Sequence, residues 1–169
     1  MEKRVWIIGA SSGIGLDLVK LWLQNNYQVI ASSRDIENSN ELLKLKSTYT
    51  NHLELLNIDV LDNENVLKSV TKAYNIFNGL DICFFNAGVY ESMTYEQWDI
   101  SNFESMININ YLGAIRVLKP LIAFLEKQKH KSTIVLNASL SSYFGLPYGG
   151  AYSASKAALV NFAQAIQPE

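Results

Sequence analysis

A tyrosine and a lysine lie four residues apart near the C-terminal end of this sequence, at Tyr152 and Lys156. On a helix this spacing places both side chains on one face. A phenol with its ordinary pKa of about 10 is a poor proton relay at neutral pH, and bringing that pKa near 7 takes about 4 kcal/mol. An ammonium about 4 Å away supplies about 1 kcal/mol in bulk water, but about 4 kcal/mol at an effective dielectric of about 20. The pair therefore predicts proton transfer in a partly desolvated site.

A glycine-rich turn near the start of the chain indicates a second kind of chemistry. Gly9, Gly13 and Gly15 follow the apolar run Val5–Ile8 and precede a segment with helical periodicity. Glycines let a backbone approach a pyrophosphate closely, and a helix N-terminus supplies free N–H groups. The spacing G-x-x-x-G-x-G differs from the common G-x-G-x-x-G fingerprint, but its place between a strand and a helix predicts dinucleotide binding. Together with the phenol and the ammonium, the turn predicts hydride transfer coupled to proton transfer.

Short apolar runs, rich in β-branched and aromatic residues, are expected to form strands. They are Val5–Ile8, Gln28–Ala31, Leu53–Ile58, Asp81–Phe85 and Thr133–Leu136. Most of them are continuous rather than alternating, which is typical of parallel strands covered on both faces. Helical segments separate them, so we expect βαβ units and an α/β fold with a doubly wound, Rossmann-like parallel sheet. Residues 1–169 are expected to form a single dinucleotide-binding domain.

Apolar residues at helical spacing predict the helices that cover this sheet. The predicted apolar stripes are Ile14, Leu18, Leu21 and Trp22; then Val66, Val70, Ala73 and Phe77; then Leu112, Ile115, Leu118, Ile122 and Leu125. A polar loop over residues 35–40 is expected to lead into another helix that begins near Asn38 or Ser39. The last two helices are expected at about 103–127 and 151–167.

Composition excludes several other classes of protein. The chain is 49% hydrophobic and 18% charged, as in ordinary globular proteins, and its net charge of -2 gives no reason to expect a nucleic-acid or anionic-membrane partner. No apolar run approaches the roughly 18 residues needed to cross a bilayer. The single cysteine, Cys83, cannot form an internal disulfide, which favours a cytoplasmic location and a small buried strand residue. His52 and His130 lie among polar residues, as in ordinary surface loops, and support no metal site.

Five motifs in this order resemble the short-chain dehydrogenase/reductase family. They are the glycine turn, Asn86-Ala87-Gly88, Asn110, Ser139 and Tyr152-x-x-x-Lys156, and the likeness runs from residue 3 to the end of the chain. The resemblance implies that Tyr152 is the general acid/base. It implies that Lys156 lowers the pKa of that tyrosine and binds the nicotinamide ribose. Ser139 would then hydrogen-bond the substrate oxygen, and Asn110 would hold a water that links Lys156 to solvent.

Neighbouring residues compete for two of these roles. Asn108 is the rival of Asn110, but the family's asparagine is followed by two residues and a glycine, as Asn110 is. Ser141 and Ser142 are the rivals of Ser139, and spacing disfavours them.

The same resemblance implies the cofactor-binding residues. They are Gly9, Ser11, Ser12, Gly13, Ile14, Gly15, Arg34, Asp59, Val60, Asn86, Ala87 and Gly88, with Tyr152 and Lys156. Asn86-Ala87-Gly88 would cap the fourth strand and support the sheet and the adenine-ribose side. Asp59 matches the family's acidic residue beside the adenine ring, although it could also be a loop carboxylate that leads into a helix.

The end of the second strand favours NADP(H) over NAD(H). An NAD enzyme needs a carboxylate there to hold the ribose 2′-OH, and this place falls on Ser33, followed by Arg34. Charge-assisted contacts from an arginine to a 2′-phosphate contribute about 1.5–3 kcal/mol. Two alternatives stay open: Asp35 could be the ribose carboxylate after a shift of one or two residues, and Arg34 could be a solvated loop charge. The family's other basic signal, just before the second glycine, is absent because Ser12 is there.

We therefore expect an NADP(H)-dependent oxidoreductase that interconverts a small-molecule carbonyl and an alcohol. The alternative is a non-catalytic or regulatory dinucleotide-binding protein with an incomplete site. Members of the resembled family normally continue through a further strand, a Pro-Gly turn, a substrate lid and a last strand, so we expect this chain to lack C-terminal strands. An apolar segment before the last helix could line a substrate pocket or could be packing; it contains Tyr143, Phe144, Leu146, Pro147 and Tyr148.

The resemblance also implies a homodimer or homotetramer, in which the helices at about 103–127 and 151–167 pair across a two-fold axis. Apolar residues on these helices exceed what one sheet contact needs, which favours such an interface. They are Leu121, Phe124, Leu159, Phe162 and Ile166.

Overall fold

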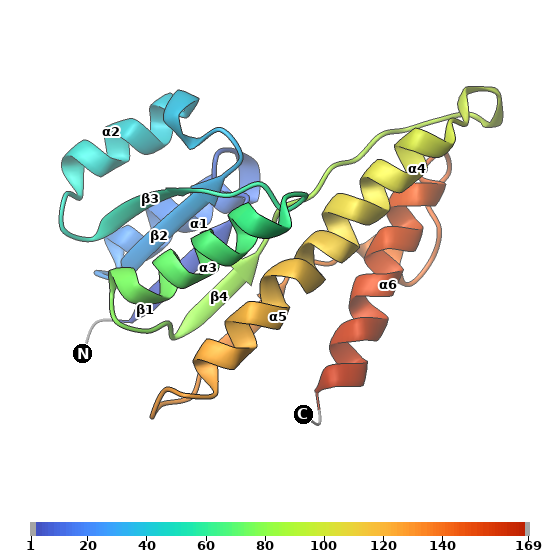
Figure 1. The fold of residues 1–169 in the computed structure, drawn as a ribbon. Coiled ribbons are helices and arrows are strands. Elements are labelled where there is room, and N and C mark those ends of the chain that lie inside the picture. Colours follow the sequence, from blue (N-terminus) through green and yellow to red (C-terminus); the bar gives the residue numbers. More distant parts are fainter. Residues whose placement is uncertain (1–2, 168–169) are drawn as a thin grey trace.

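The computed structural model describes residues 3–167, which form a parallel sheet with helices on both faces (Figure 1). The strands lie in the order β3-β2-β1-β4-β5. They are β1 (Arg4–Ile8), β2 (Gln28–Ser33), β3 (Leu53–Asn57), β4 (Ile82–Phe85) and β5 (Thr133–Leu136). The strand order reverses between β1 and β4, as in a doubly wound sheet, so the predicted fold class is confirmed.

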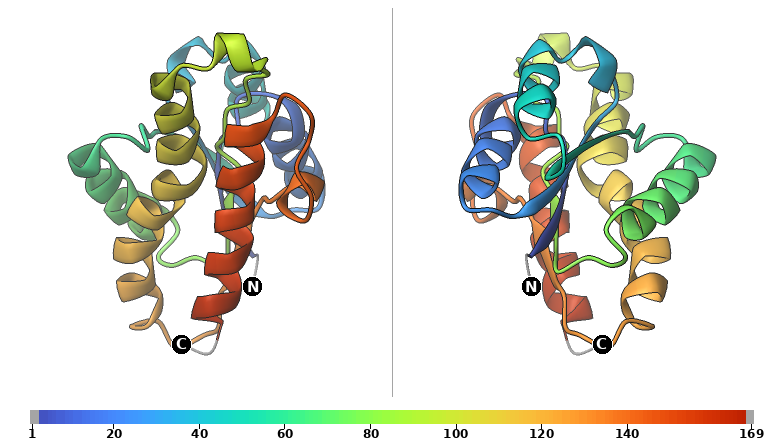
Figure 2. Two further views of the ribbon diagram at one scale, coloured as in Figure 1. Left: turned by 90° about the vertical axis from the view of Figure 1, so that its right-hand side faces the viewer. Right: turned by 90° about the vertical axis from the view of Figure 1, so that its left-hand side faces the viewer.

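Helices cover the two faces unequally (Figures 1 and 2). One face carries α1 (Gly13–Gln24) and α2 (Asn40–Thr48), and the other carries α3 (Asn63–Ile76), α5 (Gly113–Leu125) and α6 (Gly150–Ile166). A shorter helix, α4 (Ile100–Ile107), leads toward α5. Short 3₁₀ turns lie at Ile36–Asn38, Tyr95–Gln97 and Leu140–Ser142.

Strand β1 shows why the strands are continuously apolar. Val5 and Ile7 point into the cluster under α1 and α2, whereas Trp6 and Ile8 point into the cluster under α3 and α5. Both sets are fully buried because a central parallel strand has helices on each face. Cys83 of β4 pairs with Trp6 and is buried as expected, and its burial raises the pKa of the thiol to about 12.

The apolar stripe predicted for α1 was only partly right: Leu18 and Trp22 pack against the core, but the other two residues do not. Ile14 and Leu21 are 60% and 51% exposed, and the buried side of the helix instead carries Leu16, Val19 and Leu23. The reason is a contact that apolar periodicity does not describe. A Cβ atom added at Gly15 would lie only 2.0 Å from the Gly9 carbonyl oxygen. The glycine face of the helix is therefore pressed against the strand end, and this contact sets the rotation of α1.

The helix predicted at about 103–127 is three consecutive segments. A π-helical segment, Asn108–Leu112, joins α4 to α5. Within α5 the buried side carries Ala114, Val117, Leu118 and Leu121, whereas Ile115 and Ile122 of the predicted stripe are only half-buried. Leu118 of that stripe is buried, and Ile122 and Leu125 pack against the same core, so the predicted stripe runs along the margin of the buried side.

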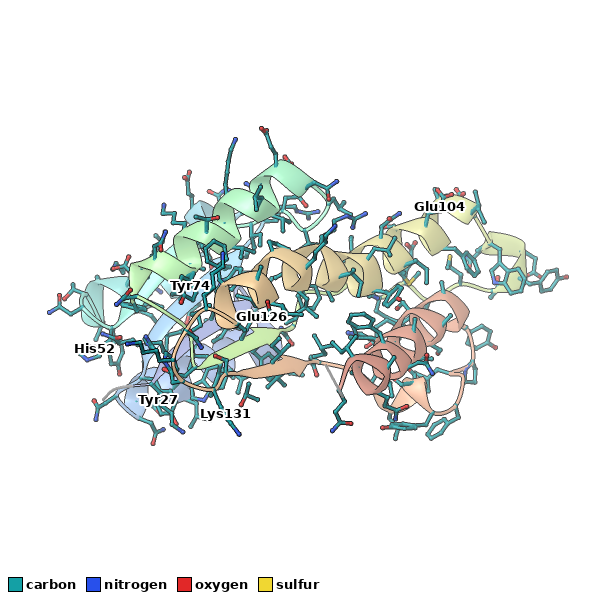
Figure 3. The ribbon with its side chains drawn as sticks, turned by 60° about the horizontal axis from the view of Figure 1, so that its bottom comes forward. Tyr27, His52, Tyr74, Glu104, Glu126 and Lys131 are labelled. Carbon is teal, nitrogen blue, oxygen red and sulfur yellow. The ribbon has the colours of Figure 1, made fainter. Side chains whose placement is uncertain are left out.

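Two residues assigned to an oligomer interface are buried inside the chain instead. Leu121 and Leu159 lie in the core between the sheet and the helices, so their assignment to an outer face was wrong. Phe124 stacks on Tyr74 of α3 with 5.0 Å between ring centroids, and Figure 3 shows Tyr74 between the two helices. Phe162 meets Tyr111 edge-on at 6.2 Å. Packing within the chain thus accounts for much of the apolar surface that favoured a dimer.

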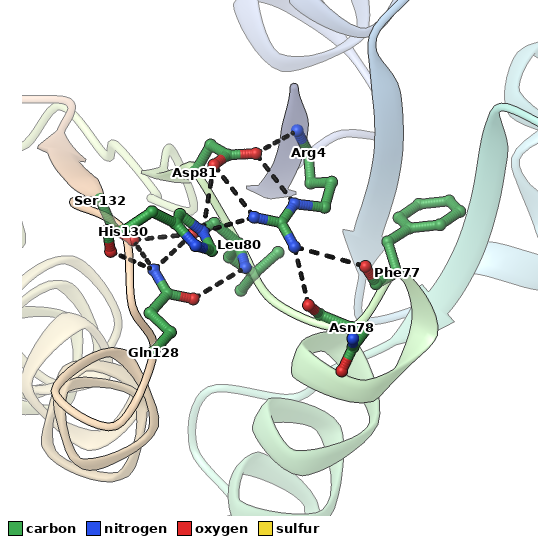
Figure 4. Close-up of polar contacts among 8 residues, drawn as sticks. All are labelled: Arg4, Phe77, Asn78, Leu80, Asp81, Gln128, His130 and Ser132. Atoms are coloured by element: carbon green, nitrogen blue, oxygen red, sulfur yellow. Dashed lines mark hydrogen bonds and ion pairs between the residues drawn. The ribbon is translucent and has the colours of Figure 1, made fainter. Parts of the chain in front are cut away.

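A polar network fastens the edge of the sheet at which the strands begin (Figure 4). Arg4 of β1 donates to both carboxylate oxygens of Asp81, at 2.9 and 3.1 Å, and to the Asn78 carbonyl at 2.7 Å. His130, before β5, lies 3.2 Å from Asp81 and also contacts Arg4. The Arg4 guanidinium holds the pKa of Asp81 below its usual value. His130 lies in an exposed loop, as predicted, and its ring also takes part in this polar network.

Candidate active site

The predicted functional residues meet at the edge of the sheet where the strands end. Because all strands are parallel, the residues that follow β1, β4 and β5 emerge at one edge. Gly9 follows β1, Asn86 follows β4 and Asn137 follows β5. Helix α6 packs beside β5 and the turn that follows it. This topology brings a phosphate-type turn and the tyrosine–lysine helix to the same edge.

The glycine turn has the bare backbone that an anion site requires. Gly9 has φ +88°, and a Cβ atom added there would lie 2.6 Å from the Ala87 nitrogen. Gly13, the first residue of α1, has φ +52°. The Gly9 and Ala10 amides both donate to the Ser32 carbonyl, at 2.8 and 2.9 Å, which ties the turn to β2. The N-terminus of a twelve-residue helix then opens directly behind the turn.

A cleft runs from this turn across the ends of β2 and β3. It is lined by Ile8, Gly9, Ser11, Ser33, Arg34, Ile58, Asp59, Val60, Leu61, Ala87, Gly88, Val89 and Ile109. Seven of the predicted cofactor residues are in this lining: Gly9, Ser11, Arg34, Asp59, Val60, Ala87 and Gly88. Of the others, Ser12, Gly13, Ile14 and Gly15 form the start of α1. Asn86 lies behind the turn and donates to the Gly9 carbonyl at 2.8 Å.

The end of β2 carries a buried hydroxyl and an exposed cation. The Ser33 hydroxyl is buried and has no hydrogen-bond partner within residues 3–167. Arg34 follows it, exposed and in the lining of the cleft. Both carboxylate oxygens of Asp35 accept from the Asn38 amide at 2.9 Å, so this carboxylate is engaged by its own loop. Within residues 3–167, the lining of the cleft does not include Asp35.

The loop after β3 holds Asp59 and Val60 against the π segment. Asp59 accepts from the Leu61 amide at 3.0 Å. A Cβ atom added at Gly113 would lie 2.9 Å from Val60 Cγ2, so only glycine permits this approach. Arg116 of α5 donates to the Val60 carbonyl at 3.4 Å and to the Asn108 carbonyl at 3.0 Å. Asn108 thus contacts Arg116, whereas Asn110 faces Val89 and Ser155.

Lys156 is a buried ammonium beneath the ring of Tyr152. Its side chain belongs to a residue that is only 4% exposed, and Nζ lies 5.8 Å from the centroid of the Tyr152 ring. The ammonium donates to the Asn137 carbonyl at 2.7 Å. Burial lowers the pKa of Lys156 from its ordinary value. The partial desolvation that a lysine needs in order to act strongly on a phenol is present here.

Asn110 is fully buried in the π segment, and its amide ties three parts of the site together. Its Oδ1 accepts from the Val89 amide at 2.8 Å, and its Nδ2 donates to the Val89 carbonyl and to Ser155 Oγ, both at 2.9 Å. Ser155 in turn donates to the Tyr152 carbonyl at 2.7 Å. A Cβ atom added at Gly88 would lie 3.2 Å from Asn110 Oδ1 and 3.5 Å from Lys156 Nζ. Gly88, Asn110 and Lys156 therefore converge on one point.

Ser139 begins the 3₁₀ turn after β5, and its hydroxyl is oriented by its neighbours. Its Oγ accepts from the Ser141 amide at 3.2 Å and from the Ser141 hydroxyl at 3.0 Å. Ser142 Oγ accepts from the Ser139 amide at 3.3 Å. With its lone pairs engaged, the Ser139 hydroxyl can donate its own proton. The rival serines 141 and 142 support Ser139 in this arrangement.

An aromatic residue that was not predicted lies against the tyrosine. Tyr90 meets the Tyr152 ring edge-on, with 4.9 Å between centroids and 81° between planes. Tyr148 has φ +62°, a conformation that L residues adopt at a cost, and its carbonyl accepts from the Met93 amide at 2.9 Å. The apolar segment before α6 is largely exposed at this end, including Tyr143, Phe144 and Leu146. The sequence does signal an aromatic environment around Tyr152, because the loops after β4 and β5 are both rich in aromatic residues.

Asn137 was also not predicted, although it directly follows a strand as Asn86 does. Its amide donates to Asn86 Oδ1 at 2.7 Å.

Two features bear on other classes of site. No group of three His, Cys, Asp or Glu side chains that could hold a metal ion occurs within residues 3–167. No helix in that part of the chain is long and apolar enough to cross a membrane.

Comparison with known proteins gives consistent matches. The family model described as short chain dehydrogenase matches residues 3–169. The 1,2-dihydroxy-1,2-dihydronaphthalene dehydrogenase of a Ralstonia species is 32% identical to this chain, over 100% of this chain and 65% of that protein. The NADPH-dependent 1-acyldihydroxyacetone phosphate reductase of Schizosaccharomyces pombe is 33% identical, over 99% of this chain and 55% of that protein.

Among solved structures, ElxO with NADP bound superposes with a TM-score of 0.87 at 30% identity, over 96% of this chain and 65% of that chain. This chain therefore spans between 55% and 65% of the length of these three proteins.

Proposed function

This chain belongs to the short-chain dehydrogenase family, and from that premise we propose that its site interconverts a carbonyl and an alcohol with NADP(H) as the hydride carrier. The observation that carries the proposal is Lys156. This buried ammonium lies under the Tyr152 ring, at the same sheet edge as a glycine turn with a bare backbone. A proton-transfer group beside a dinucleotide turn is what coupled hydride and proton transfer requires.

The residues at this edge fit a nicotinamide dinucleotide. The glycine turn offers helix N-terminal amides to the pyrophosphate, and Gly9 and Gly88 leave the backbone uncovered. The Ser33 hydroxyl, which has no hydrogen-bond partner among the described residues, supplies a donor where an adenosine ribose would lie. Asp59, Val60 and Ala87 line the remainder of the cleft. When bound, the nicotinamide supplies or accepts the hydride.

The side chains of this chain would move and hold the proton. Tyr152 donates its phenolic proton to the oxygen of a carbonyl substrate, or accepts the proton of an alcohol. Lys156 favours the phenolate electrostatically because its charge is close and poorly solvated. Ser139 donates a hydrogen bond to the reacting oxygen. Asn110 fixes the π segment beside Lys156, at the place where a water would connect the ammonium to solvent.

The preference for NADP(H) is proposed from the end of β2. At the end of β2, Ser33 takes the place of a carboxylate that would repel a 2′-phosphate. Arg34 lines the cleft as an exposed cation. Asp35, the alternative ribose ligand, is engaged by Asn38. The S. pombe relative is named NADPH-dependent, and the ElxO structure holds NADP, which support the same choice.

Tyr152→Phe in the complete protein tests the proposal. The ring still packs against Tyr90 while the proton donor is lost, so NADPH binding, followed by nucleotide fluorescence, should be retained. Turnover of a panel of aldehydes and ketones, followed by NADPH oxidation at 340 nm, should fall at least a hundredfold, the scale of general acid catalysis. Turnover within about threefold of the parent would be a far smaller loss than that expected without a general acid, and would contradict the assignment of Tyr152 as the proton donor. A parent that binds NADPH and reduces none of the panel would favour the non-catalytic dinucleotide-binding alternative.

A further inference from the structure

Three adjacent strand ends are joined by a chain of hydrogen bonds that crosses the site. Lys156 Nζ donates to the Asn137 carbonyl at 2.7 Å, after β5. Asn137 Nδ2 donates to Asn86 Oδ1 at 2.7 Å, after β4. Asn86 Nδ2 donates to the Gly9 carbonyl at 2.8 Å, after β1. The chain runs from the proton-transfer lysine to the glycine turn.

The direction of this chain is fixed by its far end. A backbone carbonyl can only accept, so Asn86 must present its NH₂ group to Gly9. Its Oδ1 then faces Asn137, which must donate through its own NH₂ group. Rotating either amide by 180° would place two donors or two acceptors against each other. The two asparagines therefore act as one unit with a single arrangement.

Both ends of the chain are held closely. At one end, a Cβ atom added at Gly15 would lie 2.8 Å from Asn86 Nδ2, so the amide is wedged between the turn and α1. At the other end, the Asn137 amide nitrogen donates to the Phe85 carbonyl at 2.9 Å, the last contact of the β4–β5 ladder. The Asn137 carbonyl points to Lys156 from a residue whose side chain is anchored on Asn86. A displacement of Gly9 therefore reaches the ammonium through two rigid amides.

We propose that Asn137 is a positioning residue that couples the occupancy of the glycine turn to the placement of Lys156. The inference rests on the proposed function for the identity of the ligand at the turn. Without its side chain, the Asn137 carbonyl is held only by its backbone, and Lys156 loses a fixed partner. The ammonium then acts less strongly on the Tyr152 phenol, and the glycine turn loses the support that Asn86 gives to Gly9.

A double-mutant cycle on NADPH affinity tests the coupling in the complete protein. Asn137→Ala and Asn86→Ala are each expected to raise the NADPH Kd roughly fivefold, and the double variant is expected to be no weaker than the weaker single variant, because either change cuts the same chain. Effects that multiply to about 25-fold would show independent contributions and overturn the proposal. Asn57→Ala is the matched control. Asn57 ends β3 at the same edge of the sheet, but it is exposed and is not one of the residues that form this series of hydrogen bonds.

Two further measurements separate positioning from a general loss of structure. The pH profile of alcohol oxidation should move to higher pH in Asn137→Ala, because the displaced ammonium then stabilises the negatively charged reacting group less. An unshifted profile would overturn the proposal. Asn137→Asp keeps the shape of the side chain but replaces the NH₂ donor that faces Asn86 Oδ1 with an acceptor oxygen. The variant should therefore fold and still raise the NADPH Kd. Unchanged affinity in that variant would also overturn it.

The affinity cycle is independent of turnover. A parent that bound NADPH without reducing any carbonyl would remove the proposed function, and the cycle would still decide whether Asn86 and Asn137 act together. An active parent with additive effects would remove the coupling alone.

Discussion

The Ser33 hydroxyl lies buried at the end of β2 with no partner among the described residues. A buried polar group that makes no hydrogen bond costs about 1–3 kcal/mol. Arg34 is exposed in the lining of the same cleft, and the next residue, Asp35, accepts hydrogen bonds from Asn38. At the scale of single residues, the protein without ligand therefore has a buried hydroxyl at Ser33 and an exposed guanidinium at Arg34, and a phosphorylated ribose would form hydrogen bonds with both.

Replacing Ser33 by alanine separates this cost from its use. Because the hydroxyl has no partner within residues 3–167, Ser33→Ala should leave the free protein as stable as the parent or more stable by up to about 1–3 kcal/mol. NADPH binding should weaken, by about 1 kcal/mol for one hydrogen bond. Thermal unfolding without ligand and NADPH titration measure the two effects. A variant that loses stability while binding NADPH unchanged would contradict this expectation.

Arg34→Ala addresses which dinucleotide is bound. The loss of a charge-assisted contact should weaken NADPH binding by about 1.5–3 kcal/mol, with little change for NADH. Asp35→Ala is the matched control, because Asp35 is the exposed neighbour engaged by Asn38. Calorimetric titration with both nucleotides decides the matter. Equal losses for NADPH and NADH, or tighter NADH binding in the parent, would show that Arg34 does not select the phosphate.

At the scale of elements, the contact between α1 and the glycine turn decides how the site is assembled. Gly15 is the third residue of α1, and an added Cβ atom would meet the Gly9 carbonyl oxygen at 2.0 Å. A Cβ atom added at Gly150, in the first turn of α6, would meet no other atom within 4 Å. Both glycines lie in the first turn of a helix but differ in what surrounds them.

This difference makes a matched pair of substitutions. Gly15→Ala should destabilise the protein by about 1–3 kcal/mol, because backbone has to move to admit the methyl group. It should also abolish tight NADPH binding, since α1 must shift from the turn. Gly150→Ala should be neutral or stabilising by up to about 1 kcal/mol. Urea unfolding of both variants measures the contrast. Similar stabilities for both would refute the contact as the feature that sets α1.

The strands and most helices could be predicted from the sequence because continuous apolar runs and helical spacing report burial directly. The rotation of α1 could not, because Ile14 and Leu21 form as regular a stripe as Leu16 and Val19, and only the Gly15 contact chooses between them. The π segment at Asn108–Leu112 is likewise continuous with its flanking helices in pattern. Motif spacing assigned residues to one sheet edge, but hydrogen bonds between strands, such as that of Asn137 to Asn86, leave no periodic signal.

At the scale of the whole molecule, the Arg4–Asp81–His130 network occupies the sheet edge opposite the site (Figure 4). The pKa of Asp81 is lowered from 3.8, chiefly by its hydrogen bond with Arg4. A carboxyl group with a lowered folded pKa contributes stability that is fully present above the unfolded value and is lost as pH falls through the folded value. The network should therefore stabilise the protein at neutral pH and fail in acid.

Asp81→Asn should remove this pH-dependent contribution. At pH 7 the variant should be less stable than the parent by about 1.5–3 kcal/mol, the scale of hydrogen bonds to a charged group. The difference should shrink as pH falls below 3.8 and through the lower folded pKa. Urea unfolding at pH 7 and in acid follows both proteins, with Glu64→Gln, a carboxylate in an exposed helical pair with Lys68, as the control. A difference that stays constant with pH would contradict the linkage.

The distance between these two edges has an evolutionary consequence. Strands of four to six residues separate them, roughly 13–20 Å at about 3.3 Å per residue. Substitutions that far apart act additively, so stabilising changes around Arg4 and His130 leave the cleft untouched. Sequence drift at the cleft can alter which molecule is accepted while reserve stability accumulates at the opposite edge. The fold can thus tolerate substitutions in the cleft that change ligand specificity and lower stability.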